Sequence, residues 1–234
     1  MRLLTTDNLK IRKGDKYGYL GTVLMLAPST LSGHNVCPMA SAGCKAACLN
    51  TAGNGLYPAT QEARIKRTRW FFEDRTGFMR QLAHELSLHI AKANREGKIP
   101  VVRLNGTSDI RWENIPVVTD GKVYRNIMAR FSDVQFYDYT KLPNRRNLPD
   151  NYHLTFSRSE VNEAHAIGEL EAGKNVAVVF RLPKGKVLPE TWNGFRVISG
   201  DEHDLRFLDP AGVVIGLKAK GSAWTDMSGF TIRL

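Results

Sequence analysis

Three cysteines are the residues with the clearest chemical potential in this sequence. Cys37, Cys44 and Cys48 are the only cysteines among 234 residues, and they follow one another with the spacing C-x6-C-x3-C. An odd number of thiols cannot all be paired in disulfides, and a reducing compartment disfavours disulfides altogether. Thiolates are preferred ligands of zinc and of iron–sulfur clusters. The grouped thiols therefore predict a metal centre.

The number of available ligands decides between the metals. Structural zinc takes four protein ligands, and only His34, three residues before Cys37, could complete a Cys3His set. A [4Fe–4S] cluster can instead be held by three thiolates, which leaves one iron open for a substrate, a cofactor or another ligand. We therefore expect a [4Fe–4S] cluster on Cys37, Cys44 and Cys48, with a zinc site or metal-free buried or redox thiols as the alternatives.

The elements that must position these thiols alternate along the chain. The cysteine loop, at about residues 27–55, follows an apolar strand-like run at 19–26 and contains turn-forming residues at Pro28, Gly33, Pro38 and Gly43. Two helices are expected next, at 58–75 and 77–95, the second with an apolar residue every fourth position and Gly97 as its C-cap. Further strands are expected at 100–104, 134–139, 152–156, 176–180, 195–199 and 213–218, with a short helix at 160–171.

These elements indicate an α/β fold. Several of the strands are almost continuously apolar, which is typical of a parallel sheet buried on both faces. The later crossovers contain little helix, so we expect an incomplete (partial) β/α barrel with a mostly parallel sheet, or an open sheet, rather than a complete barrel. The length and the 42% hydrophobic content fit one domain over residues 1–234.

Polar residues follow the predicted strands where each one ends. If the sheet is parallel, these ends meet at one edge, where binding sites of α/β proteins usually lie. The polar ends occur at 103–109, 138–141, 157–160, 181, 200–204 and 218–220. The sequence therefore predicts a polar ligand site beside the cysteine loop.

The cysteine loop and the helix after it resemble the gene-product-88-like family of bacteriophage proteins. The resemblance covers about residues 20–75 and lies in these segments: Leu26-Ala27-Pro28, Ser32-Gly33-His34-Asn35-Val36-Cys37-Pro38, Ala40-Ser41-Ala42-Gly43-Cys44, Cys48-Leu49, Ala52-Gly53-Asn54-Gly55, Ala63-Arg64 and Arg67-Thr68. It implies a phage origin and the host bacterial cytoplasm, and it implies no particular activity.

A more distant resemblance is to radical S-adenosylmethionine enzymes. These proteins carry a three-cysteine [4Fe–4S] loop after the first strand of a partial α/β barrel, and the open iron of the cluster binds S-adenosylmethionine. The C-x6-C-x3-C spacing departs from the C-x3-C-x2-C of that family. The resemblance implies that Asn105, Ser108 and Asp109 bind the cofactor ammonium, and that Ser157 and Arg158 meet its ribose or carboxylate. It implies radical chemistry or electron transfer, but it assigns neither a substrate nor a catalytic residue.

The alternative function is a binding module without catalysis. The net charge is +10, and the predicted helix at 58–75 is rich in arginine beside Trp70, Phe71 and Phe72, a combination compatible with nucleic-acid binding. In that case the cluster or zinc would only stabilise a protein that binds nucleic acid or a host protein. No apolar run is long enough to cross a bilayer, and the polar start of the chain lacks the apolar core of a signal peptide, so we expect a cytoplasmic protein without a membrane partner.

Overall fold

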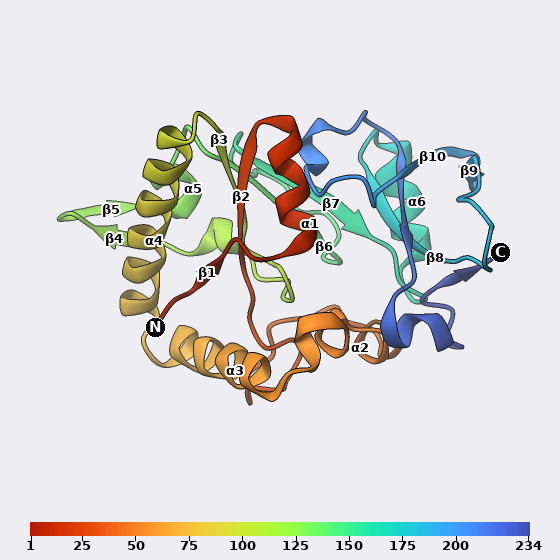
Figure 1. The fold of residues 1–234 in the computed structure, drawn as a ribbon, viewed down its shortest axis with the longest axis horizontal. Helices are drawn as coiled ribbons and strands as arrows, with labels where there is room; N and C mark the ends of the chain where they lie inside the picture. Colours follow the sequence, from red (N-terminus) through yellow and green to blue (C-terminus); the bar gives the residue numbers. More distant parts are fainter.

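A computed structural model describes residues 1–234, and a ten-stranded sheet runs through it (Figure 1). Its strands, in chain order, are β1 (Leu4–Thr5), β2 (Tyr19–Leu24), β3 (Ile99–Arg103), β6 (Gln135–Thr140), β7 (Tyr152–Ser157), β8 (Val176–Arg181), β9 (Thr191–Trp192), β10 (Phe195–Ser199), β11 (Val214–Lys218) and β12 (Ile232–Arg233). A separate hairpin is formed by β4 (Val117–Thr119) and β5 (Lys122–Tyr124).

The helices are fewer than the strands. They are α1 (Leu9–Arg12), α2 (Ala42–Ala46), α3 (Pro58–Glu73), α4 (Arg75–Arg95), α5 (Ile127–Arg130) and α6 (Glu163–Glu171). Short 3-10 turns connect several elements: η1 (Lys13–Tyr17), η2 (Leu49–Thr51), η3 (Gly53–Leu56), η4 (Trp112–Asn114), η5 (Arg206–Leu208) and η6 (Gly221–Thr225). None of the helices has the length and apolar character needed to cross a membrane.

The sheet is mostly parallel and open. Neighbouring strands follow the order β1-β2-β3-β6-β7-β8-β11-β10-β9, with β12 added beside β8. All neighbours in the central part run parallel, whereas β1 and β9 pair antiparallel with β2 and β10 at the two edges. No hydrogen-bonded pairing joins the two edges, so the sheet does not close. The predicted α/β class and parallel strands are thus confirmed.

Helices α4 and α6 lie on one face of the sheet. Val102 of β3 and Phe136 of β6 are register partners and pack in a buried core with Phe78 and Leu82 of α4. Further along the same face, α6 covers β7 and β8 through Ala166 and Leu170. Apolar positions four residues apart explain why α4 buries one side. Helices on one side of a sheet leave the other face to different partners.

The opposite face is covered by short segments. Val23, Val101 and Tyr137 of three neighbouring strands contact Ile11 of α1 and Leu205, which directly precedes η5. Figure 1 shows α1 in front of the sheet, near its centre. At the carboxyl ends of the strands, apolar side chains do not completely fill the space over this opposite face. The cysteine loop covers the face there (Figure 1, lower edge).

Candidate metal centre

The cysteine loop leaves the carboxyl end of β2 and folds back over the sheet. Ser29 adopts a left-handed conformation (φ 53°), and its N–H donates to the sulfur of Cys37 over 3.3 Å. Ser41 caps the N-terminus of α2 by accepting from the N–H of Cys44. The sulfur of Cys48 accepts from the N–H of Asn50 over 3.5 Å. Backbone N–H groups directed at two of the sulfurs are what a negatively charged centre requires.

All three cysteines line one cavity of about 290 Å³, which lies between the cysteine loop and the face of the sheet that α1 covers. The opposite wall is formed by the carboxyl ends of β3, β6, β7 and β11, including Tyr139, Ser157 and Leu217. The ends of these four strands thus meet beside the cysteine loop, whereas Arg181 at the end of β8 does not line the cavity. The cysteines are half-buried and free of disulfides.

Burial raises the pKa of two of the thiols. The pKa of Cys37 rises to about 11, mainly through burial and also through the neighbouring thiols of Cys48 and Cys44, whereas the bond from Ser29 opposes the rise. Burial also raises the pKa of Cys48, against a lowering by the Asn50 N–H and by the cations of Arg64 and Lys141. The three sulfurs thus lie close enough to influence one another.

The sulfurs do not form a site for a single metal ion. No three side chains among His, Cys, Asp and Glu are grouped closely enough to hold one ion. His34, the fourth ligand that a zinc site would need, does not line the cavity and instead stacks on Phe72 with ring centroids 4.2 Å apart. His34 is therefore not placed to complete the Cys3His zinc set that was the alternative.

Asn105, Ser108 and Asp109 all lie at the cavity, after β3. The Asn105 oxygen accepts from the Ser108 hydroxyl at 2.8 Å, the Ile110 N–H at 2.9 Å and the Trp112 indole at 3.0 Å. Its side chain therefore fixes the shape of this turn. The carboxylate of Asp109 accepts from the Thr140 hydroxyl and the Lys141 N–H, and burial raises its pKa despite these bonds.

Ser157 and Arg158 have different surroundings. The Ser157 hydroxyl lies in the cavity and accepts from Nζ of Lys141 at 2.7 Å. Arg158 does not line the cavity. Its guanidinium donates to the carboxylate of Glu163 and to the carbonyl oxygens of Gly229 and Phe230. The structure brings Ser157, but not Arg158, to the predicted site.

Two further residues hold the cysteine loop through contacts that were not predicted from the sequence. Glu160 follows β7 and accepts from the Ser41 hydroxyl at 2.7 Å and from the Gly43 N–H at 2.8 Å. Ser222 of η6 donates to the carbonyl of Ala46 at 2.8 Å. The sequence signal for Glu160 is its position among the polar residues that follow the predicted strands. This signal does not identify its hydrogen-bond partners.

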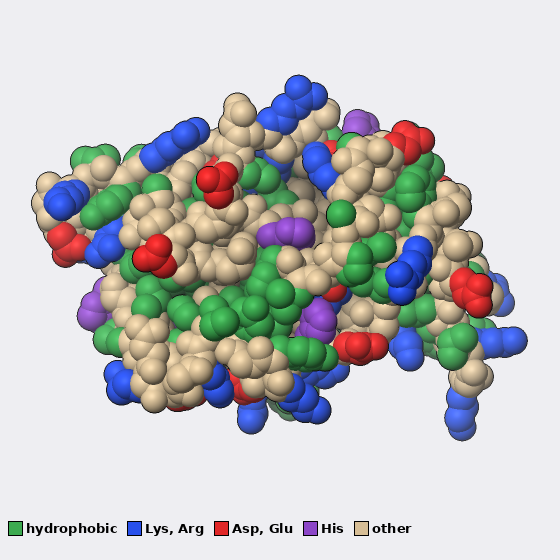
Figure 2. All heavy atoms as spheres, turned by 90° about the horizontal axis from the view of Figure 1, so that it is seen from above, with side chains coloured by type: hydrophobic (Ala, Val, Ile, Leu, Met, Phe, Trp, Pro, Cys, Tyr) green, Lys and Arg blue, Asp and Glu red, His purple; other side chains and the backbone are tan.

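The arginines of α3 point toward the protein rather than forming a free basic stripe. Arg64 donates to the side chain of Asn50, and Arg67 donates to the carbonyls of Arg2 and Met25. Arg69 also donates to a backbone carbonyl, as does Arg75 at the start of α4. On the face seen from above in Figure 2, opposite α2 and α3, Lys and Arg side chains lie around the edge and hydrophobic ones near the middle. Neither α3 nor this face presents a continuous basic surface for nucleic acid.

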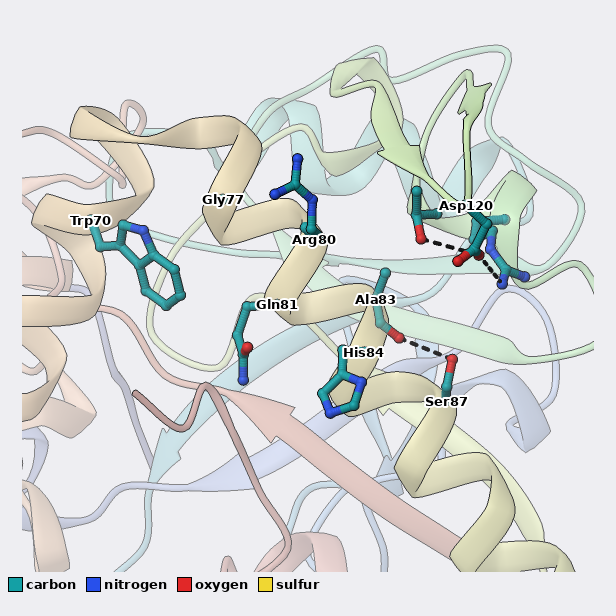
Figure 3. A pocket seen from close by; sticks show the side chains of 10 residues that line it. Trp70, Gly77, Arg80, Gln81, Ala83, His84, Ser87 and Asp120 are labelled. Atoms are coloured by element: carbon teal, nitrogen blue, oxygen red, sulfur yellow. Dashed lines mark hydrogen bonds and ion pairs between the residues drawn. The ribbon is translucent and has the colours of Figure 1, made fainter.

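A second hollow, of about 470 Å³, lies between α4 and the β4–β5 hairpin (Figure 3). Its lining is polar, with Arg80, Gln81 and His84 from α4. Across it, Arg130 is paired with Asp120 at 3.2 Å. It contains no thiol and lies apart from the strand ends, so the cavity beside the cysteine loop is the better candidate.

The fold and the site define an α/β protein with an open, mostly parallel sheet and a three-cysteine pocket at the carboxyl ends of its strands. The chain belongs to the gene product 88 family, which matches residues 2–234. The phage family expected from the motifs is therefore confirmed, and the match extends well beyond the cysteine loop. No curated protein and no solved structure matches the chain, so the radical-enzyme resemblance gains no support from these comparisons.

Proposed function

We propose that this phage protein binds a [4Fe–4S] cluster through Cys37, Cys44 and Cys48. The observation that carries the proposal is that all three thiols of the chain line one cavity with the strand ends. Thiols without a common role have no reason to meet at the edge of a parallel sheet. We also propose that the protein acts in the cytoplasm of the host bacterium.

The surroundings of the thiols suit a cluster. Pro28, Ala40, Ala47 and Phe230 contribute an apolar lining, which limits access of water to iron and sulfide. Burial raises the pKa of Cys48, and the cations of Arg64 and Lys141 oppose that rise and would balance the charge of a metal-bound thiolate. A charge-compensated, partly apolar pocket with three sulfur donors is a complete protein contribution to such a site.

One side of the cavity has no thiols and is formed by the strand ends. A [4Fe–4S] cluster supplies one-electron transfer and, with S-adenosylmethionine on its open iron, radical chemistry. Ser157 and Lys141 present a hydroxyl and an ammonium group on that side, while Asn105 fixes the turn that carries Ser108. The proposal therefore extends to a partial-barrel architecture of the radical S-adenosylmethionine type, in which these residues position a bound cofactor or substrate.

Purification without oxygen tests the proposal. We expect a brown protein with about four irons per chain, bleached by a strong reductant. Replacing Cys37, Cys44 or Cys48 singly by serine should each remove most of the iron. Met39→Ser is the matched control, because Met39 lies in the same loop, is exposed and offers no thiol.

The outcomes separate the alternatives. A colourless protein with one zinc per chain refutes the cluster and favours the stabilised binding module. A brown protein whose paramagnetic resonance spectrum changes on adding S-adenosylmethionine supports the radical chemistry. An unchanged spectrum leaves electron transfer or a structural role as the function of the cluster and refutes the extension to radical chemistry.

A further inference from the structure

The wall of the cavity opposite the thiols collects positive charge from separate parts of the chain. Five cationic side chains line the cavity, and only two carboxylates, Asp109 and Asp201, lie among the lining residues. The cations come from α1, from the ends of β3, β6 and β11, and from the segment after β11: Lys10, Arg103, Lys141, Lys218 and Lys220. Elements distant in sequence converge here.

Two of these cations form the floor. Arg103 Nη1 lies 2.9 Å from one oxygen of Asp204, and Lys10 Nζ lies 3.2 Å from the other. Both cations also lie near the ring of Tyr139, at 4.7 Å for the Arg103 guanidinium carbon and 5.7 Å for Lys10 Nζ. The buried carboxylate of Asp204 thus fixes both positive groups at the base of the cavity, and the buried carboxylate of Asp138 is a second partner of Arg103, 4.0 Å from its Nε.

The rim adds cations that have no acidic partner. Lys141 donates to the neutral hydroxyl of Ser157 and lies over the ring of Phe230. Lys218 has no carboxylate within ion-pair distance, whereas Lys220 is paired with Asp201 at 3.2 Å. Asp204 and Asp138 lie against the floor cations, Asp201 against Lys220 and Asp109 against Arg145, so an excess of two unpaired positive charges remains on Lys141 and Lys218.

A cluster alone does not account for this excess. A [4Fe–4S] core in its oxidised state, held by three thiolates, carries roughly one negative charge. The cluster would lie against the cysteine loop, whereas the cations lie on the sheet side of the cavity. Cations gathered in a partly desolvated cavity attract a ligand of opposite charge more strongly than they would in open water.

We propose that the cavity binds a small anionic molecule through its carboxylate or phosphate group, held between the floor cations Lys10 and Arg103 and the rim cations Lys141 and Lys218. A cavity of about 290 Å³ admits a small metabolite and not a folded partner or a duplex. The anion would be the substrate class of the proposed iron–sulfur site, and in this respect the inference rests on the proposed function. The arrangement of cations does not itself need the cluster.

Calorimetric titration with inorganic phosphate and with succinate, at fixed ionic strength, tests the inference. It is done on the reconstituted protein and on protein stripped of iron. Lys141→Gln and Lys218→Gln should each raise the dissociation constant of the tighter-binding anion by about fivefold. Lys122→Gln is the matched control, because Lys122 lies exposed in the separate β4–β5 hairpin and away from the cavity. Thermal melts confirm that all variants fold.

Each outcome bears on a different statement. Lysine-dependent anion binding by a protein that holds no iron supports the anion site and refutes the cluster. Full iron content with anion affinities equal in Lys218→Gln, Lys141→Gln and the control supports the cluster and overturns the anion site. Lysine-dependent binding of a single-stranded oligonucleotide, with no affinity for phosphate or succinate, also overturns it and favours the nucleic-acid alternative. A preference for phosphate over succinate, or the reverse, identifies the recognised group.

Discussion

Glu160 should control how firmly the cysteine loop is held. Glu160 lies shortly after the end of β7. Its carboxylate accepts from the Ser41 hydroxyl at 2.7 Å and from the Gly43 N–H at 2.8 Å. Both donors belong to the first turn of α2, which carries Cys44. Glu160→Gln keeps the size of the side chain but removes its charge and replaces one acceptor oxygen by an amide that cannot accept. The Gly43 N–H can still donate to the amide oxygen, whereas the bond to Ser41 must be lost or reversed, and both contacts lose their charged acceptor.

The structure sets the size of the effect. A hydrogen bond to a charged group contributes about 1.5–3 kcal/mol. Glu160 is half-buried, and solvent screening reduces that value, so we expect a loss of about 1–2 kcal/mol in the local stability of the loop. This corresponds to amide exchange faster by roughly 5–30-fold in residues 41–48. Because α2 carries one proposed ligand, the iron should also be lost faster to a chelator.

Hydrogen exchange followed by mass spectrometry, together with the rate of iron release, measures the prediction. Glu171→Gln is the control, since Glu171 is exposed at the end of α6 and forms no ion pair. Exchange accelerated in the whole protein rather than in 41–48 would show that Glu160 supports global stability and not the loop. Unchanged exchange in that peptide would refute the reasoning directly.

Three further substitutions test the packing and the electrostatics of the protein. Gly43→Ala should displace α2 and lower iron binding, because the added methyl would lie 2.1 Å from Ser228 Oγ. Gly168→Ala in α6 places its methyl where no atom lies within 4 Å. This substitution should raise the free energy of unfolding, measured in urea, by about 0.5–1 kcal/mol. Burial raises the pKa of Asp138 from 3.8 to about 7, so the folded state binds a proton that the unfolded chain has lost, and stability should fall as the pH rises from about 4 to about 7. Asp138→Asn should reduce the difference in unfolding free energy between pH 5 and pH 8 by about 3 kcal/mol, and an undiminished pH dependence in this variant would contradict the assignment.

The long elements of the fold could be predicted from the sequence because each carries a strong local pattern. The apolar runs that became β2, β3 and β8 and the four-residue periodicity of α4 are examples. The four-residue α1 and the β4–β5 hairpin escaped prediction, because segments this short contain no complete period. Whether the sheet closes depends on contacts between its two edges, and no local pattern contains that information.

The candidate site shows the same division. Three thiols of one loop are visible as a group because they are close in sequence. The floor cations are not, since Lys10 reaches the cavity from α1 and Arg103 from β3, and their common partner Asp204 lies in a third segment. A lysine in a short amphipathic turn looks like any surface lysine until the strands bring these segments together.

Arg158 follows the cavity residue Ser157 in sequence but has a different role from the one predicted. The resemblance to radical enzymes assigned it to cofactor binding, yet its guanidinium holds the carbonyl oxygens of Gly229 and Phe230. That segment is the surface against which Gly43 packs without room for a side chain. Arg158 therefore acts on the cysteine loop through the chain that lies behind it. Since Glu160, two residues further on, holds the same loop from its N-terminal turn, the residues that follow Ser157 position the cysteine loop, whereas Ser157 itself lies in the cavity.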